Sequence, residues 1–188
     1  MTAETCFCRQ TAVETCPARD AIPALQMMRF REVTPSDVPS LFHVRTRTRE
    51  NAYSLEELTQ LGITEEAVRA RMSSTLKGWL CEVGDAVVGF CMADRDDGEL
   101  WVIAVLPEFE GRGIGGRLMD LAEAWLWASG CERAWLTTDV DTALRAYGFY
   151  RKRGWADWKI EEGLRWMRLA APGAARAGNP GQESMPYL

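Results

Sequence analysis

A glycine-rich segment at residues 111–116, Gly-Arg-Gly-Ile-Gly-Gly, most constrains what this chain can fold into. It follows an apolar run at residues 99–105 and precedes an amphipathic run that Gly130 ends. The first N–H groups of a helix have no internal partner, and the aligned peptide dipoles favour an anion there. Glycine lets a phosphate approach the backbone closely. The segment therefore predicts a pyrophosphate-binding loop between a strand and a helix.

Two well-known phosphate motifs fit this segment in part. The pattern G-x-G-x-x-G over residues 111–116 matches the dinucleotide fingerprint, and Asp139 follows at about the 20-residue spacing of a ribose-binding acid. However, that fingerprint belongs after the first strand of a doubly wound sheet, and over half of this chain precedes it. The segment also begins like a Walker A loop, but Arg117-Leu118 stands where Lys-Ser/Thr is needed. A nicotinamide or flavin enzyme thus remains a distant alternative, and a P-loop NTPase is disfavoured.

Composition favours one globular domain with a full core. The chain has 188 residues, 47% of them hydrophobic, and a net charge of −5, which argues against nucleic acid as a partner. No run approaches the roughly 18 apolar residues of a membrane helix, and the start is neither basic nor apolar like a secretory signal. The six cysteines lack C-x-x-C spacing, and His43 is the single histidine. We expect a cytoplasmic protein that binds no metal, nucleic acid or membrane.

The periodic patterns define one domain at residues 27–170. Residues 1–26 show no clear period and form a predicted flexible extension, while residues 171–188 are rich in Ala, Gly and Pro and are predicted to be disordered. Within the domain, Ser36 is the expected N-cap of a first helix that reaches about residue 49. Ser54 and Glu57 form a capping box for a second helix.

The remaining patterns predict a mixed α/β arrangement. A third helix is expected from residue 64 to about residue 76. Strands are predicted at residues 28–33, 79–83, 86–93, 99–105, 133–138, 155–160 and 164–169, and further helices after the glycine loop and at residues 142–153. The order implies three consecutive strands followed by one crossover helix.

The glycine loop resembles the acetyl-CoA loop of the GCN5-related N-acetyltransferases, the GNAT family. The resemblance rests on the spacing Val-x-Pro-x-x-x-Gly-x-Gly-x-Gly over residues 105–115. A second segment, residues 143–155, resembles the family's N-x-x-A-x-x-F-Y-x-x-x-G-F/W signature. Its matching positions are Ala146, Phe149, Tyr150, Gly154 and Trp155. The chain departs from the family at Glu110, where Gln or Arg is usual, and at Ala143, where Asn is usual.

The resemblance implies a fold and a co-substrate. The fold would be the acyl-CoA N-acyltransferase fold, a mixed sheet of about six to seven strands flanked by about four to five helices. The co-substrate would be acetyl-CoA, with no metal. The implied acetyl-CoA site combines strand and loop residues: Ile103, Ala104, Val105, Gly111, Arg112, Gly113, Ile114, Gly115 and Gly116.

The resemblance also implies a chemistry. An amine would attack the thioester directly, and Tyr150 would protonate the leaving thiolate. The general base stays open among Asp139, Glu99, Glu50 and a water relay, because Thr137-Thr138 stands where many relatives carry Glu. The resemblance implies a small-molecule or peptide amine as the acceptor.

Substrate contacts are expected from the first helices and their connection, above all from Arg49 and Asn51, with Arg45 on the same helix face as Arg49. A homodimer is compatible with the resemblance. The competing interpretation is an acyl-CoA-binding sensor or interaction module with little turnover, which Glu110 and Ala143 keep open.

Overall fold

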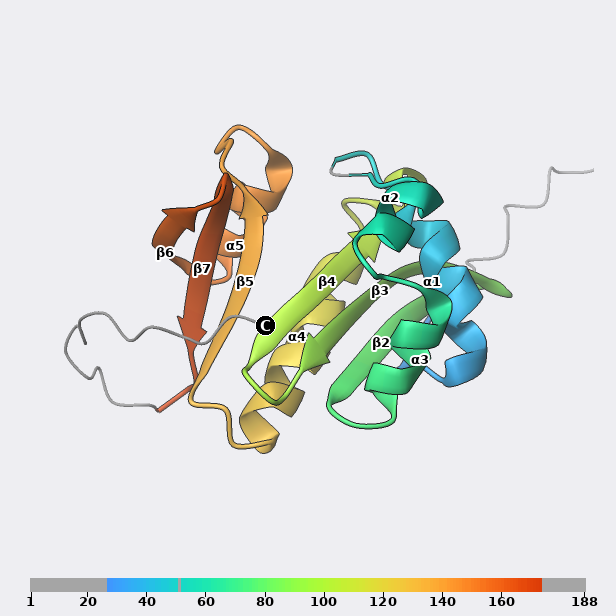
Figure 1. Ribbon diagram of the computed structural model, residues 1–188, viewed down its shortest axis with the longest axis horizontal. Helices are drawn as coiled ribbons and strands as arrows, with labels where there is room; N and C mark the ends of the chain where they lie inside the picture. The colour runs from blue at the N-terminus through green and yellow to red at the C-terminus, as the bar shows by residue number, and fades with distance from the viewer. Residues whose placement is uncertain (1–26, 51, 174–188) are drawn as a thin grey trace, which may run out of the picture.

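The computed structural model describes residues 27–50 and 52–173, which form one twisted sheet with helices on both faces (Figure 1). The predicted extension at residues 1–26, most of the predicted tail, and Asn51 lie outside the described residues.

The sheet has seven strands in the order β1-β2-β3-β4-β5-β7-β6. Their bounds are β1 Met28–Glu32, β2 Leu76–Val83, β3 Ala86–Asp94, β4 Glu99–Val105, β5 Arg133–Asp139, β6 Ala156–Glu161 and β7 Leu164–Ala170. Every neighbouring pair is antiparallel except β4 and β5, which run parallel because the crossover helix joins them. The predicted mixed sheet with one crossover is therefore present.

The helices form two layers. Helices α1 (Val38–Arg45), α2 (Leu55–Gln60) and α3 (Glu65–Met72) lie over the β1–β4 part of the sheet. The crossover helix α4 (Ile114–Ala128) and α5 (Arg145–Lys152) lie on the opposite face. Arg153, just after α5, donates hydrogen bonds to Asp120 (2.7 Å) and Glu123 (2.9 Å) of α4, so these two helices are held side by side.

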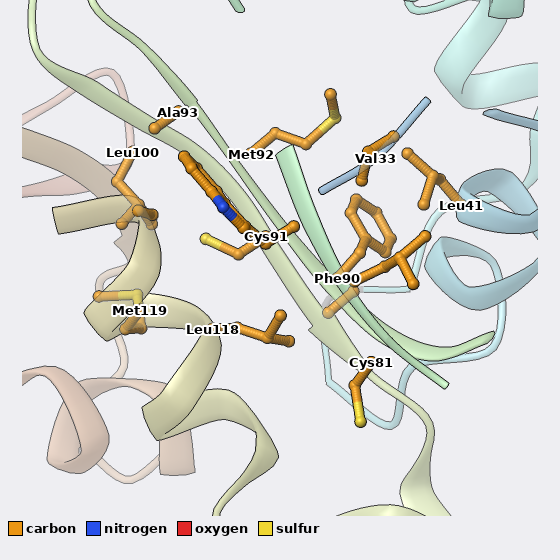
Figure 2. Close-up of a cluster of buried hydrophobic side chains, with 14 of the residues drawn as sticks. Val33, Leu41, Cys81, Phe90, Cys91, Met92, Ala93, Leu100, Leu118 and Met119 are labelled. Atoms are coloured by element: carbon orange, nitrogen blue, oxygen red, sulfur yellow. The ribbon is translucent and has the colours of Figure 1, made fainter. Parts of the chain in front are cut away.

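Strand β3 is the centre of the core because helices cover both of its faces. Phe90 and Met92 point towards Leu41 of α1, while Cys91 points towards Leu118 of α4 (Figure 2). Strand β3 is almost wholly buried from Val88 to Asp94, as expected of a strand that alternates between two apolar layers.

Element ends differ from the sequence predictions where side chains compete with the helix. Thr34, not Ser36, is the first N-cap, and its capping box with Asp37 opens a short 3-10 turn ahead of α1. Helix α1 ends at Arg45 rather than near residue 49. The Thr46 and Thr48 hydroxyls donate to the carbonyls of Phe42 (3.1 Å) and Arg45 (3.3 Å), which favours a turn. Helix α3 ends at Met72, and β2 already begins at Leu76.

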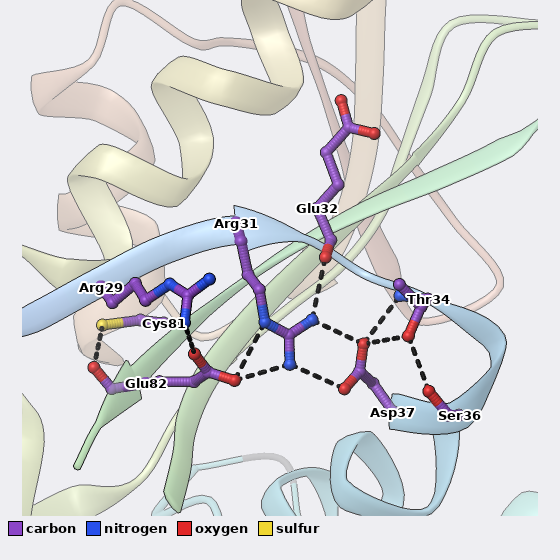
Figure 3. A network of polar contacts seen from close by, with 8 residues as sticks. All are labelled: Arg29, Arg31, Glu32, Thr34, Ser36, Asp37, Cys81 and Glu82. Carbon is purple, nitrogen blue, oxygen red and sulfur yellow. Dashed lines mark hydrogen bonds and ion pairs between the residues drawn. The ribbon is translucent and has the colours of Figure 1, made fainter. Parts of the chain in front are cut away.

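A cluster of charges fastens the start of α1 to the sheet edge. The Arg31 guanidinium on β1 donates to both carboxylate oxygens of Asp37 (2.7 and 2.8 Å) and to Oε1 of Glu82 on β2 (Figure 3). The hydrogen bonds from Arg31 hold the pKa of Asp37 below its usual range. Because all three side chains are mostly buried, this cluster fixes where α1 crosses the sheet.

Replacing Arg31 should test that role. We expect Arg31→Met to lower the free energy of unfolding by about 1–3 kcal/mol at pH 7, since two carboxylates lose their cation. Arg29→Met is the control, because Arg29 is exposed and lies 4.0 Å from Glu82. Because the folded protein lowers the pKa of Asp37, the ionised carboxylate stabilises the fold above the usual Asp pKa, and this stabilisation is lost as the pH falls. The difference in the free energy of unfolding between wild type and Arg31→Met should therefore become smaller below about pH 4. Equal denaturation midpoints for both variants at pH 7 would contradict this.

Strands β4 and β5 approach each other closely at one end. The Trp135 backbone N–H donates to the Gly98 carbonyl (3.0 Å), and the Trp135 indole N–H donates to the Asp97 carbonyl (3.1 Å). Gly98 has φ +80°, and a Cβ built there would lie 2.5 Å from the Arg133 carbonyl oxygen. A residue without a side chain is therefore required for both conformation and space.

Gly98→Ala should push β4 and β5 apart at this junction. We expect a loss of about 2–4 kcal/mol in the free energy of unfolding, from left-handed strain together with a weakened backbone hydrogen bond. The matched control is Gly130→Ala. Gly130 has φ +93° but open space around its Cβ position, so strain alone should cost about 1–2 kcal/mol. Chemical denaturation of both variants measures the difference, and equal losses would refute the steric argument.

Candidate active site

Beyond their junction, β4 and β5 diverge and expose the edge of β4. Among the described residues, the register between these strands contains the single pair Glu99–Trp135. Strand β4 also carries a β-bulge. Met92 pairs with Val102 and Asp94 pairs with Glu99, so one residue lies between the paired positions on β3 and two lie between them on β4. From the bulge onwards, every second residue of β4 directs its N–H and C=O towards the gap instead of towards a paired strand.

The gap between the strands holds a cavity of about 140 Å³. Its walls come from the α1 end, β4, β5 and α5. The lining residues are Arg45, Thr48, Glu50, Leu100, Trp101, Val102, Ile103, Thr137, Thr138, Asp139, Leu144, Ala146 and Tyr150. The predicted strand residue Ile103 lies in this wall, while Ala104 and Val105 continue the same strand.

The glycine loop gives α4 an open N-terminus. A short 3-10 turn (Pro107–Phe109) leads into Gly111 at φ +73° and Gly113 at φ +82°. Gly113 is the N-cap of this 15-residue helix. Because glycine has no side chain that could accept from the first-turn N–H groups, these groups stay available for an anion. A Cβ at Gly111 or Gly113 would meet no atom within 4 Å, which leaves room for a phosphate to approach. The loop therefore fits a pyrophosphate group.

The other predicted loop residues have different surroundings. A Cβ on Gly115 would point inwards, 3.6 Å from the Phe149 ring and 3.7 Å from Ile103, so this glycine lies where β4, α4 and α5 meet. The Arg112 guanidinium turns back to the Glu108 carbonyl (3.0 Å) and stacks on the Phe109 ring. The contribution of Arg112 to an anion site is thus its backbone rather than its charge.

Tyr150 is the buried aromatic residue of α5. Its side chain is 7% exposed, packs edge-on against Phe149, and lines the cavity. Helix α5 is strongly amphipathic, and Tyr150 is its one buried residue, which explains why this phenol faces inwards. Burial raises the pKa of Tyr150, so the phenol remains protonated at neutral pH.

The three candidate bases separate into two groups. Asp139 and Glu50 line the cavity together with Tyr150. Glu99 lies at the strand junction, 3.8 Å from Arg71, outside the cavity wall. Burial raises the pKa of Glu99 to about 7, but Glu99 is not among the residues that line the cavity with Tyr150. The geometry therefore favours Asp139 and Glu50.

Glu110 connects Arg49 to the start of α5. Glu110 makes ion pairs with Arg145, at the start of α5, and with Arg49 (3.5 Å). Arg49 is thus drawn to the start of the glycine loop and does not line the cavity, whereas Arg45 does.

Sequence reasoning did not single out Leu144 as a wall residue, and no local signal identifies it.

The described residues contain no group of three or more His, Cys, Asp or Glu side chains that could hold a metal ion. Among the same residues, no helix is long and apolar enough to cross a membrane.

Comparison with known proteins identifies the family. The family model described as "Acetyltransferase (GNAT) family" matches residues 38–155. The N-acetyltransferase PaiA of Thermoplasma acidophilum, solved in complex with coenzyme A, superposes with a TM-score of 0.67 at 18% identity, covering 77% of this chain and 99% of that one. The ribosomal-protein-S18-alanine N-acetyltransferase of Escherichia coli gives 0.62 at 17% identity, covering 81% and 99%.

These matches confirm the predicted acyl-CoA N-acyltransferase fold, with seven strands in a mixed sheet and five α-helices in the described part of the chain. The chain belongs to the acetyltransferase (GNAT) family, whose co-substrate is acetyl-CoA.

Proposed function

We propose that this chain is an N-acetyltransferase that moves an acetyl group from acetyl-CoA to a primary amine by direct attack, with Tyr150 as general acid. The observation that carries the proposal is the cavity between β4 and β5. There the open edge of β4, the buried phenol and two carboxylates lie together. The glycine loop is close by, because a Cβ on Gly115 would contact Ile103 of the cavity wall.

The chain offers two backbone surfaces to the co-substrate. The first-turn N–H groups of α4 would bind the pyrophosphate, and the open edge of β4 would pair with the amides of the pantetheine arm as an added strand does. When bound, acetyl-CoA supplies an activated acyl group as a thioester. A backbone N–H of β4 beyond the bulge would stabilise the negative charge that develops on the thioester oxygen.

The reaction balances through two proton movements. The neutral amine nitrogen forms a bond to the carbonyl carbon, and the carbon–sulfur bond breaks. The nitrogen loses one proton and the thiolate gains one, giving an amide and free coenzyme A. Conversion of the incoming ammonium to the amine releases one further proton. The chain therefore needs a base near the nitrogen and an acid near the sulfur.

Tyr150 suits the acid because burial keeps its phenol protonated. A thiolate formed in the same buried space is also destabilised by desolvation, so burial raises the pKa of the leaving thiol in the same direction as that of the phenol. The residues proposed for the base are Asp139 and Glu50, which line the same cavity, directly or through a bridging water. Their carboxylates would also attract the incoming ammonium.

The loop should need a glycine at the N-cap of α4. Gly113→Ala introduces left-handed strain and a methyl group in front of the helix N-terminus, so we expect acetyl-CoA affinity to fall about tenfold or more. Gly130→Ala, at the other end of the same helix, is the control, because its φ of +93° brings comparable strain and no atom lies within 4 Å of its Cβ position. Calorimetric titration of acetyl-CoA into both variants and the wild type measures the difference. Equal affinity of all three proteins would argue against the loop as the pyrophosphate site.

Substitution of two tyrosines on α5 should show whether Tyr150 is the general acid. We expect Tyr150→Phe to lower kcat about 100-fold or more with little change in KM for acetyl-CoA. Tyr147→Phe is the control, because Tyr147 lies at the surface of α5, 3.3 Å from Asp157, and does not line the cavity.

The assay measures release of free coenzyme A with a panel of amines. An unaffected kcat in Tyr150→Phe would reject Tyr150 as the acid. Tight acetyl-CoA binding by the wild type without release above hydrolysis, for any amine, would instead favour a sensor.

A further inference from the structure

A second cavity, of about 90 Å³, lies beside the one described above. Helices α1, α2 and α3 form one side of it, and strands β3 and β4 form the other. Ten of the described residues line it, and nine of these are apolar, among them Phe42, Ile63 and Met92. Arg45 is the one charged residue of these ten. The volume corresponds to roughly six waters at about 15 Å³ each, which suits one aliphatic side chain.

The two cavities adjoin. Arg45, Trp101 and Val102 line both of them. Trp101 and Val102 both reach this wall because the bulge in β4 interrupts the normal alternation of side chains. A molecule with its amine at the β4 edge would therefore have the apolar cavity within reach of the next few atoms.

Charge is distributed unevenly along this path. Glu50 and Asp139 line the first cavity, and none of the described residues that line the second carries a carboxylate. Arg45 stands at the boundary, with its guanidinium 4.6 Å from the centroid of the Tyr53 ring. Burial lowers the pKa of Arg45, because desolvation disfavours its charged form.

We propose that the acceptor is an apolar α-amino acid, whose ammonium faces Asp139 and Glu50, whose carboxylate binds Arg45, and whose side chain fills the second cavity. This inference rests on the proposed N-acetyltransferase activity. The three features follow the order of groups on one α-carbon: a cation site, an anion site and an apolar site that share a boundary. Polyamines and aminosugars lack an apolar group that would fill the second cavity, and polyamines also carry additional cations.

A panel of matched acceptors tests this inference with the full chain and acetyl-CoA. L-leucine and L-methionine should give a kcat/KM about tenfold or more above L-glutamine, which lacks the apolar end, because buried apolar groups discriminate on that scale. Leucine should exceed leucinamide and a leucine-initiated peptide by a similar factor, because both lack the α-carboxylate. Equal or better use of leucinamide, the peptide, glutamine or spermidine would overturn the inference while leaving the N-acetyltransferase proposal intact. Use of no acceptor at all would overturn both.

Two variants add an independent readout. Arg45→Met should raise KM for leucine about tenfold and remove the preference for leucine over leucinamide. Arg47→Met is the control, since Arg47 contacts His43 and lines neither cavity.

Ile63→Trp would fill the second cavity and should abolish the preference for leucine over glycine. An unchanged preference for leucine in both Arg45→Met and Ile63→Trp would refute the assigned subsites. The wild-type panel keeps the inference testable if either variant fails to fold.

Discussion

The close approach of Gly98 to β5 is the constraint on which the rest of this molecule depends. Two parallel strands joined at one end and separated at the other leave a gap with a backbone edge, and the whole candidate site is built around it. The joined end needs a residue with positive φ and no Cβ, because the Arg133 carbonyl occupies the space of a side chain. The other end is held open by α4 and α5, which Arg153 connects through Asp120 and Glu123. Divergence is thus a property of the whole packing rather than of one loop.

Sequence reasoning succeeded where the determining contacts are local. The glycine spacing, the strand before it and the amphipathic helix after it lie within about thirty residues, so a phosphate loop follows from short-range chemistry. The Ser54 capping box is another local device, and its reciprocal hydrogen bonds are present. The same reasoning failed at the end of α1. Threonines are compatible with the hydrophobic pattern of a helix, but here their hydroxyls donate to carbonyls at its C-terminal end, and the helix ends early.

The parts that the sequence did not reveal arise from contacts between distant segments. Arg45 and Arg49 occupy equivalent positions on a helical pattern, yet Arg45 lines both cavities and Arg49 pairs with Glu110 of the glycine loop. Nothing local separates these two arginines. Likewise, Glu99 and Asp139 are both acids at strand ends, and the divergence of β4 and β5 decides that Asp139 lines the cavity while Glu99 does not. Residue roles here depend on the tertiary arrangement.

The Glu110 bridge shows how a departure from the family pattern is accommodated. An unpaired carboxylate at the start of a loop suited to pyrophosphate would repel the anion that the backbone amides attract. Arg145 and Arg49 both pair with Glu110, so the three side chains together carry one positive charge. They also join the segment after α1, the glycine loop and the start of α5. An acidic residue at this position therefore preserves a favourable field for an anion and adds a link that an uncharged glutamine could not supply through ion pairs.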